Sequence, residues 1–217
     1  QTIEAMSDAD PHPDHNSRLS RDIAADALLL GCGLGTHADT AALLHDLAAR
    51  YHDRPMVWDA DALNLLAADP ALQAKLPPAS VLTPHPGEFA RLAGRPLAHD
   101  RERIAAARDL AACLQAVVVL KGKNSIISAP GGDTLINPTG NAGLAKGGSG
   151  DVLAGIIAAL LAQGYPPFPA AAIGTYLHGL AADLALASSY LTSFTARDLI
   201  AAIPAALQSL FPEPLIS

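Results

Sequence analysis

Positive charge and cysteine are both scarce in this sequence, and each shortage excludes a class of protein. The chain of 217 residues has 14 Lys and Arg against 21 Asp and Glu, a formal net charge of -7, and no basic run. Nucleic acids and anionic membranes bind to positive surfaces, so we expect neither as a partner. The two cysteines, Cys32 and Cys113, form no CxxC pair and no cluster with histidine. We therefore expect two buried or half-buried thiols in a reducing cytosol.

A long hydrophobic run is missing as well. The longest apolar run, Val152–Ala162, is too short to span a bilayer, and the segment Gln1–Asp22 is polar and acidic, unlike a signal peptide. These features predict a cytoplasmic location. Four histidines have no partner at metal-ligand spacing, so we assign no metal-ligating residue among them: His12, His15, His99 and His178.

Apolar residues make up 50% of the chain and charged residues only 16%, a composition typical of a globular domain. No repeat or linker divides residues 1–217, which predicts one α/β domain. Short apolar segments predict strands at Ala27–Leu30, Pro55–Trp58, Ser80–Leu82 and Ala116–Leu120, and a hairpin of Ile126–Ser128 and Thr134–Ile136. Helical spacing predicts helices at His37–Tyr51, Ala62–Ala68, Glu88–Ala93, Arg101–Leu114, Val152–Ala162, Pro169–Ser188 and Thr195–Leu210. This alternation predicts a mostly parallel sheet with helices on both faces.

Four unusual turns each follow one of the predicted strands: Gly31–Gly35, Asp59–Asp61, Thr83–Glu88 and Lys121–Ser125. In parallel sheets, ligands bind beside the carboxyl ends of the strands. We therefore expect these turns to gather along one edge of the sheet. Asp59 and Asp61 of the second turn could bind a cation, but turn and cap roles are simpler, with Asp61 capping the helix that begins at Ala62.

The strongest chemical signal is the stretch Asn137–Asp151, which holds five glycines and leads directly into an apolar helix. Glycines let a phosphate approach successive backbone N–H groups, and the amino end of a helix favours anions. Asp151 suits a base for a hydroxyl that attacks phosphorus, or an outer ligand of Mg²⁺. The alternative is a helix cap in a tight turn. The stretch lacks the Gly-Lys-Ser/Thr of a P-loop, and Gly31–Gly35 lacks the third glycine of a dinucleotide fingerprint.

Several motifs together resemble one family. Asn137–Asn141 leading to Gly147–Asp151 is similar to one signature of the ADP/ATP-dependent NAD(P)H-hydrate dehydratases, and Thr83–Phe89 is similar to a second. Asp59–Asn64 and Lys121–Gly122 fall between them in the expected order. The resemblance runs from about Leu28 to the end and implies a ribokinase-like three-layer α/β sandwich. It also implies nucleotide-dependent repair of NADH and NADPH hydrated at C6, by phosphorylation of the C6 hydroxyl and elimination of phosphate.

The resemblance assigns a role to each site residue. It places Asp151 as the catalytic base, and Gly35, His85 and Asp151 in contact with the hydrated dinucleotide. It assigns the adenine nucleotide, ADP or ATP, to Lys121, Gly122, Lys123, Asn124, Ser125 and Gly150, and an anion hole to Gly148, Ser149 and Gly150. Mg²⁺ is expected to bridge the nucleotide phosphates. The resemblance also implies that the chain assembles into a homo-oligomer, a tetramer, and that its partner is a fused or separate epimerase.

The sequence departs from the family pattern at two places, and two other functions remain as alternatives. Cys32 stands where the family usually has proline, and nothing matches the strand, glycine turn and helix that open the family domain. Gln1–Met6 is similar to the tail of a later strand, so we expect an amino-terminally shortened domain. His85 alone would be a structural turn residue, and Glu88 equally a first-turn helix charge. The other functions are a kinase for a vitamin precursor or sugar, and a nucleotide-binding module without turnover.

Overall fold

The computed structural model describes residues 24–97, 100–187 and 191–210 of the chain. The strand tail expected at Gln1–Met6 and the polar start of the chain lie outside these residues, as does Ser188 at the end of a predicted helix. Within the described part, every predicted strand and helix is present, with boundaries that differ by up to three residues.

The strands form a single sheet in their order along the chain. They are β1 (Leu28–Leu30), β2 (Met56–Trp58), β3 (Ser80–Leu82), β4 (Val117–Leu120), β5 (Ile126–Ser128) and β6 (Thr134–Ile136). β1 to β4 pair in parallel, and β5 and β6 continue the sheet as an antiparallel hairpin. The prediction of a mostly parallel sheet is confirmed.

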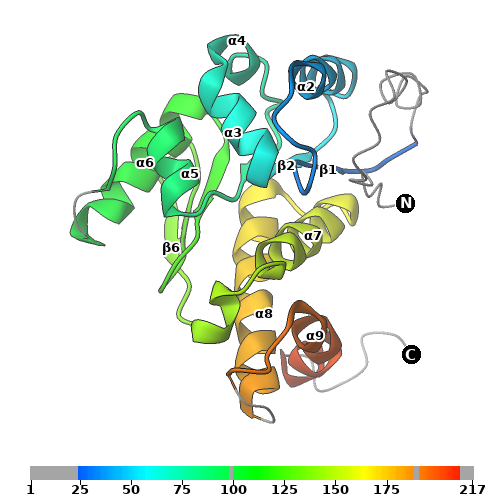
Figure 1. The fold of residues 1–217 in the computed structure, drawn as a ribbon, viewed down its shortest axis with the longest axis vertical. Coiled ribbons are helices and arrows are strands. Elements are labelled where there is room, and N and C mark those ends of the chain that lie inside the picture. Colours follow the sequence, from blue (N-terminus) through cyan, green and yellow to red (C-terminus); the bar gives the residue numbers. More distant parts are fainter. Residues whose placement is uncertain (1–23, 98–99, 188–190, 211–217) are drawn as a thin grey trace.

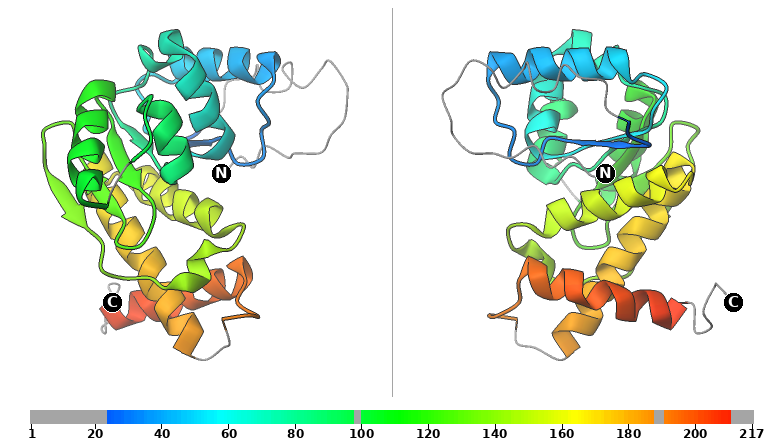
Figure 2. Two further views of the ribbon diagram at one scale, coloured as in Figure 1. Left: turned by 60° about the vertical axis from the view of Figure 1, so that its left-hand side comes forward. Right: turned by 90° about the vertical axis from the view of Figure 1, so that its right-hand side faces the viewer.

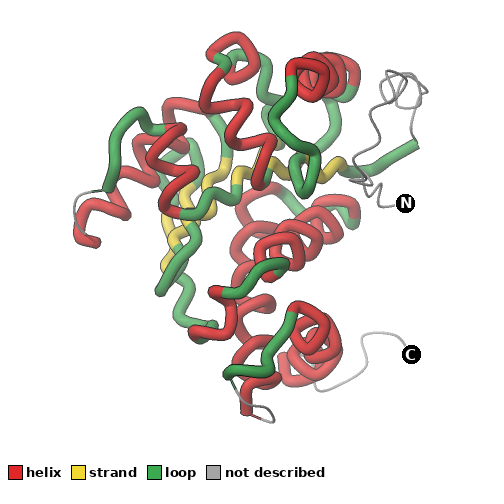
Figure 3. Tube along the Cα trace, in the orientation of Figure 1, coloured by secondary structure: helices red, strands yellow, loops and turns green. Residues whose placement is uncertain are grey.

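Helices cover both faces of this sheet, with the strands as a band between them (Figures 1 and 3). One face carries α2 (Ala38–Arg50), α3 (Ala60–Ala68), α4 (Pro70–Gln73), α5 (Pro86–Leu92) and α6 (Arg103–Leu114). The other side holds α7 (Ser149–Ala162), α8 (Pro167–Ala187) and α9 (Ala196–Leu210). Two short 3₁₀ helices, η1 (Asp100–Glu102) and η2 (Ala142–Ala145), lie in the connections. The expected three-layer sandwich is confirmed.

The side chains of β2 show why both faces need cover. Met56 and Trp58 are fully buried in the cluster with α2 and α3, whereas Val57 is fully buried in the cluster with α7 and α8. Successive side chains of a strand point to opposite faces, so a strand that is apolar throughout needs helices on both faces.

α8 is the core helix of the second side (Figure 2). By length and composition it is the one described helix that could cross a membrane, but 56% of its most apolar stretch is buried inside the protein. It packs against α7, α9 and three strands of the sheet. Its buried residues include two polar ones, Thr175 and His178.

α3 begins earlier than predicted. The helix starts at Ala60, directly after Asp59, and Asp61 lies in its first turn. The Asp61 carboxylate accepts a hydrogen bond from the Gly35 N–H at 2.8 Å. The prediction that Asp61 caps the helix was therefore wrong. A left-handed Ala60, with φ of +47°, turns the chain from β2 into the helix before the expected capping position.

Candidate active site

The turns that follow the four parallel strands meet at one edge of the sheet, as predicted. Gly35, after β1, donates to Asp61 after β2. Thr83, after β3, donates from Oγ1 to Asp59 Oδ1 at 2.8 Å, and Lys121, after β4, donates from Nζ to the same oxygen at 2.7 Å. These contacts join residues that are distant in sequence because the carboxyl ends of parallel strands share one edge.

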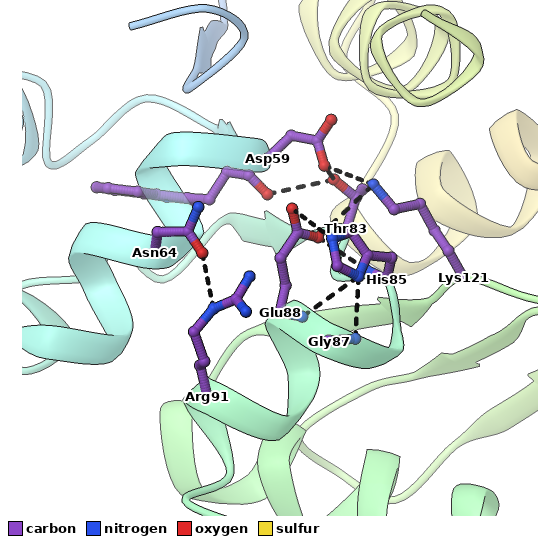
Figure 4. Close-up of polar contacts among 9 residues, drawn as sticks. Asp59, Asn64, Thr83, His85, Gly87, Glu88, Arg91 and Lys121 are labelled. Atoms are coloured by element: carbon purple, nitrogen blue, oxygen red, sulfur yellow. Dashed lines mark hydrogen bonds and ion pairs between the residues drawn. The ribbon is translucent and has the colours of Figure 1, made fainter. Parts of the chain in front are cut away.

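Asp59 lies at the centre of this junction and is 1% exposed (Figure 4). Its backbone N–H donates to the carbonyl of Leu30 at 3.0 Å. Gly31 packs so closely that a Cβ there would overlap the Asp59 carbonyl oxygen. Although Asp59 precedes α3, its side chain makes no capping hydrogen bond. Asp59 lies in the turn, where its carbonyl accepts from the Ala62 N–H, but the expected cap role of its side chain was wrong, because the carboxylate is committed to Thr83 and Lys121.

Lys121 connects this junction to the glycine turn. Its side chain is 20% exposed, and Nζ lies 3.9 Å from Glu88 Oε2 in addition to its contact with Asp59. A Cβ placed on Gly150 would stand 3.4 Å from Lys121 Nζ and 3.7 Å from Asp59 Oδ2. The structure therefore brings two of the predicted nucleotide-binding residues, Lys121 and Gly150, side by side.

His85 begins α5 as its N-cap. Its Nδ1 accepts hydrogen bonds from the N–H groups of Gly87 at 2.9 Å and Glu88 at 3.3 Å, and the Glu88 carboxylate accepts one from the His85 N–H at 2.8 Å. Since Nδ1 is an acceptor, the ring proton is on Nε2, which lies 3.3 Å from Glu88 Oε1. Pro86 occupies the first helical turn. The ring is 51% exposed and fixed in orientation, so it can still contact a ligand.

The turn after β4 is shaped by Arg103 of α6. Its guanidinium donates to the carbonyl of Lys123 at 2.9 Å and to that of Lys121 at 3.4 Å. Gly122 has φ of +146°, and a Cβ there would stand 2.8 Å from Arg103 Nη2. Asn124 is also left-handed, with φ of +56°. Sequence reasoning missed Arg103, because a single arginine on an amphipathic helix gives no signal of a distant backbone contact.

The predicted anion hole coincides with the start of α7. Gly148 is its N-cap, with φ of +86°, and the helix begins at Ser149. The Ser149 N–H donates to Lys146 O at 3.4 Å, and no described residue accepts from the Gly150 N–H. The first turn of a helix leaves such N–H groups for an anion. Buried His178 fixes this turn from α8, with Nε2 lying 2.8 Å from the Ser149 carbonyl oxygen.

Asp151 is exposed in the first turn of α7, and its carboxylate lies within 4.8 Å of the Cys32 thiol and the Asp59 carboxylate. Burial and the charges of these two aspartates raise the pKa of Cys32 to about 12, so the thiol stays protonated. The Lys121 ammonium already pairs with Asp59, so it competes with any divalent cation for that carboxylate. Cys113 is exposed, which corrects the expectation that both thiols are at least half-buried.

The turn Asn137–Asn141 is held by α8. The Asp183 carboxylate accepts hydrogen bonds from the Gly140 N–H and from Asn141 Nδ2, both at 2.9 Å. Thr139 Oγ1 donates to the Tyr176 carbonyl at 2.9 Å. These side chains support the backbone that leads to the predicted anion hole. Asp183 is a second residue that the sequence did not single out, since it lies mid-helix among apolar neighbours.

Comparison with known proteins agrees with this geometry. A family model described as NAD(P)H-hydrate dehydratase matches residues 2–205. The chain is 47% identical, over 161 residues, to the ADP-dependent (S)-NAD(P)H-hydrate dehydratase of Neisseria meningitidis, a match that covers 73% of this chain and 54% of that protein. It is 45% identical, over 196 residues, to the bifunctional NAD(P)H-hydrate repair enzyme Nnr of Moorella thermoacetica, covering 90% of this chain and 37% of the relative. The chain thus spans about half or less of the length of these relatives.

A solved structure shares the fold over most of the described chain. The ADP/ATP-dependent NAD(P)H-hydrate dehydratase of Bacillus subtilis, co-crystallised with ATP and Mg²⁺, superimposes with a TM-score of 0.77 at 33% sequence identity, covering 89% of this chain and 69% of that one. The expected ribokinase-like sandwich is therefore confirmed. Since the family model also covers almost the whole chain, this chain belongs to the NAD(P)H-hydrate dehydratase family.

Proposed function

We propose that this protein uses an adenine nucleotide to dehydrate NADH or NADPH that has been hydrated at C6. The observation that carries the proposal is an exposed carboxylate, Asp151, at an anion-favouring helix end beside the Lys121 ammonium. A carboxylate there would repel a phosphate that is only bound, but it suits a base that deprotonates a hydroxyl attacking that phosphate. The relatives' names supply the substrate class.

The proposed reaction has two steps. In the first, Asp151 accepts the proton of the C6 hydroxyl as its oxygen bonds to the terminal phosphorus of the nucleotide, whose bridging oxygen leaves with the shortened nucleotide. In the second, the C6–O bond breaks, phosphate leaves, and loss of the neighbouring carbon's proton restores the ring double bond. Phosphate is a far better leaving group than hydroxide, which is the reason to consume a nucleotide.

The remaining residues of the site bind and orient the two substrates. The turn Lys121–Ser125 holds the nucleotide, and the N–H groups of Gly148 and Gly150 face the charge that develops on the transferred group. Gly35 and His85 contact the hydrated dinucleotide. Mg²⁺, bound through the nucleotide phosphates, would neutralise part of their charge.

Substitution of the proposed base tests this function. Asp151→Asn is expected to lower the rate of repair of hydrated NADH by about 10²–10⁴-fold while calorimetry shows unchanged nucleotide affinity, because the amide keeps the shape but cannot accept a proton. Asp109→Asn, an exposed carboxylate on α6, is the matched control and should match wild type. Near-normal repair by Asp151→Asn would remove Asp151 from the base role. Nucleotide consumption with phosphate retained on a small alcohol would instead indicate a kinase.

We propose a cytoplasmic homo-oligomer, a tetramer by family resemblance, and the exposed apolar side chains of α8 and α9 offer a surface for it: Ile173, Tyr176, Leu184, Ile200 and Leu207. The bifunctional name of the Moorella relative supports a fused or separate epimerase as partner. Light scattering of the purified protein measures its oligomeric state, and a monomer would contradict the proposed homo-oligomer.

A further inference from the structure

A buried carboxylate beside a phosphate-binding helix end needs an explanation. Burying Asp59 removes it from water, which is costly unless the charge is paired and hydrogen-bonded. The cost is met locally, because Lys121 Nζ and Thr83 Oγ1 both donate to Asp59 Oδ1, at 2.7 and 2.8 Å. A fold that needed only a stable core could place an apolar residue here, as it does at neighbouring Trp58 and Leu82.

The backbone around Asp59 is held at a conformational cost. Ala60, directly after it, has φ of +47°, a left-handed conformation that residues with a Cβ adopt rarely. Strained residues of this kind persist where the surroundings fix them. Here the Asp59 N–H donates to Leu30, and Gly31 leaves room for the Asp59 carbonyl that no other residue would leave. The turns that follow β1 and β2 thus fix the orientation of the Asp59 carboxylate.

The Asp59 carboxylate points toward the amino-terminal end of α7. Lys121 carries a flexible four-carbon stem whose ammonium can occupy many positions when it is free. The ion pair with Asp59 places it where a Cβ of Gly150 would be 3.4 Å away, with the Asp59 and Asp151 carboxylates within 4.8 Å of each other. One of the three ammonium hydrogens is used by Asp59. The other two make no closer hydrogen bond, although Glu88 Oε2 lies 3.9 Å from Nζ, and they can face an anion at the end of the helix.

We infer that Asp59 is a positioning residue that holds the Lys121 ammonium at the amino-terminal end of α7, between the nucleotide phosphates and the base Asp151. The inference rests on the proposed function and adds a residue to it. Asp59 itself is no base, because it is buried and its Oδ1 already accepts two hydrogen bonds, whereas Asp151 is exposed. The two carboxylates therefore have different roles. Asp151 accepts the proton, and Asp59 fixes the Lys121 ammonium that faces the transferred phosphoryl group.

Kinetics of Asp59→Asn test the inference. The amide is isosteric and can still accept from Thr83, but it attracts the ammonium far less. We expect kcat to fall about 10²-fold, the loss typical of a displaced catalytic group, with KM for the hydrated dinucleotide nearly unchanged. In a Lys121→Met background the same substitution should cost little more, because no ammonium remains to be positioned. Asp69→Asn, a carboxylate that pairs with His45 far from the site, is the matched control and should keep wild-type rates.

A labelling experiment tests the anchoring without activity. Limited acylation of amines, read by peptide mass spectrometry, should modify exposed Lys123 faster than Lys121 in the wild-type protein, and Asp59→Asn should bring the Lys121 rate close to that of Lys123. If Asp59→Asn does not fold, Asp59→Glu keeps the charge but moves it by one methylene, and should also lower kcat. The inference would be overturned by a wild-type kcat in Asp59→Asn or Asp59→Glu. It would also be overturned if Lys121 were labelled at the same rate in Asp59→Asn as in the wild-type protein. An inactive wild-type protein would instead contradict the proposed function and leave the labelling result decisive for Asp59.

Discussion

Gly179 of α8 touches the turn Asn137–Asn141 so closely that one added methyl group should destabilise the protein. A Cβ at Gly179 would overlap Thr139 Oγ1 and stand 2.7 and 2.8 Å from the Thr139 carbonyl carbon and oxygen. Ordinary contacts begin at 3.4 Å, and two of these neighbours are backbone atoms. In Gly179→Ala the turn must therefore move away from the helix by about 1 Å, since a carbonyl cannot swing aside as a side chain can.

The expected magnitude follows from opposing terms. Replacing glycine by alanine inside a helix ordinarily stabilises it by about 1 kcal/mol. Overpacking costs about 1–3 kcal/mol, and the displaced turn weakens the hydrogen bond from Thr139 Oγ1 to Tyr176, worth about 1 kcal/mol more. The net result is a destabilisation of about 1–3 kcal/mol. For a chain of this size that lowers Tm by about 2–12 °C.

Gly155→Ala is the matched control, because Gly155 lies inside α7 and a Cβ there meets nothing within 4 Å. It should raise Tm slightly, by the helix propensity alone. Thermal unfolding followed by circular dichroism measures both variants. If Gly179→Ala were as stable as Gly155→Ala, the close contact between α8 and the turn, and its support of the proposed anion hole, would be refuted.

Two further predictions concern titratable side chains. Because the pKa of Cys32 is raised to about 12, a disulfide reagent at neutral pH should modify exposed Cys113 rapidly and Cys32 only after unfolding, and rapid reaction of both thiols would contradict the site geometry. Burial lowers the pKa of His178 below its ordinary value of 6.5, so below that pH the unfolded chain binds a proton that the folded protein does not. Stability should therefore fall as pH drops from about 6.5 toward the lowered pKa, and His178→Gln should reduce this loss in denaturant titrations; an unchanged pH dependence would assign the loss to other groups.

The sheet could be predicted from the sequence because its strands are short, apolar and separated by helical spacing. A strand such as β4, four buried residues of which three are β-branched valines, offers one consistent local signal. α4 could not be predicted in this way. It has only four residues, and it depends on Asp69, whose carboxylate accepts hydrogen bonds from Ala71 and Leu72, rather than on periodicity.

The candidate site was predictable only in part. The glycines and Asp151 form a contiguous pattern, so this turn could be singled out from the sequence as a candidate anion-binding turn. Asp59 was assigned a local role because an aspartate before a helix usually caps it. Its true partners, Thr83 and Lys121, lie 24 and 62 residues away along the chain, and only the parallel order of β2, β3 and β4 brings them together.

The same topology explains why the site concentrates strain and charge at one edge. Each crossover returns the chain to the same end of the sheet, so every turn there borders the next, and a conformation costly in one turn can be held by its neighbours. Gly31 fixes the Asp59 backbone, Asp59 fixes the Lys121 ammonium, and that ammonium lies beside Gly150. A substitution at Gly31 would thus act on the proposed phosphoryl transfer through two intervening residues. Sequence patterns report each turn alone, whereas the chemistry depends on the order in which the sheet sets them side by side.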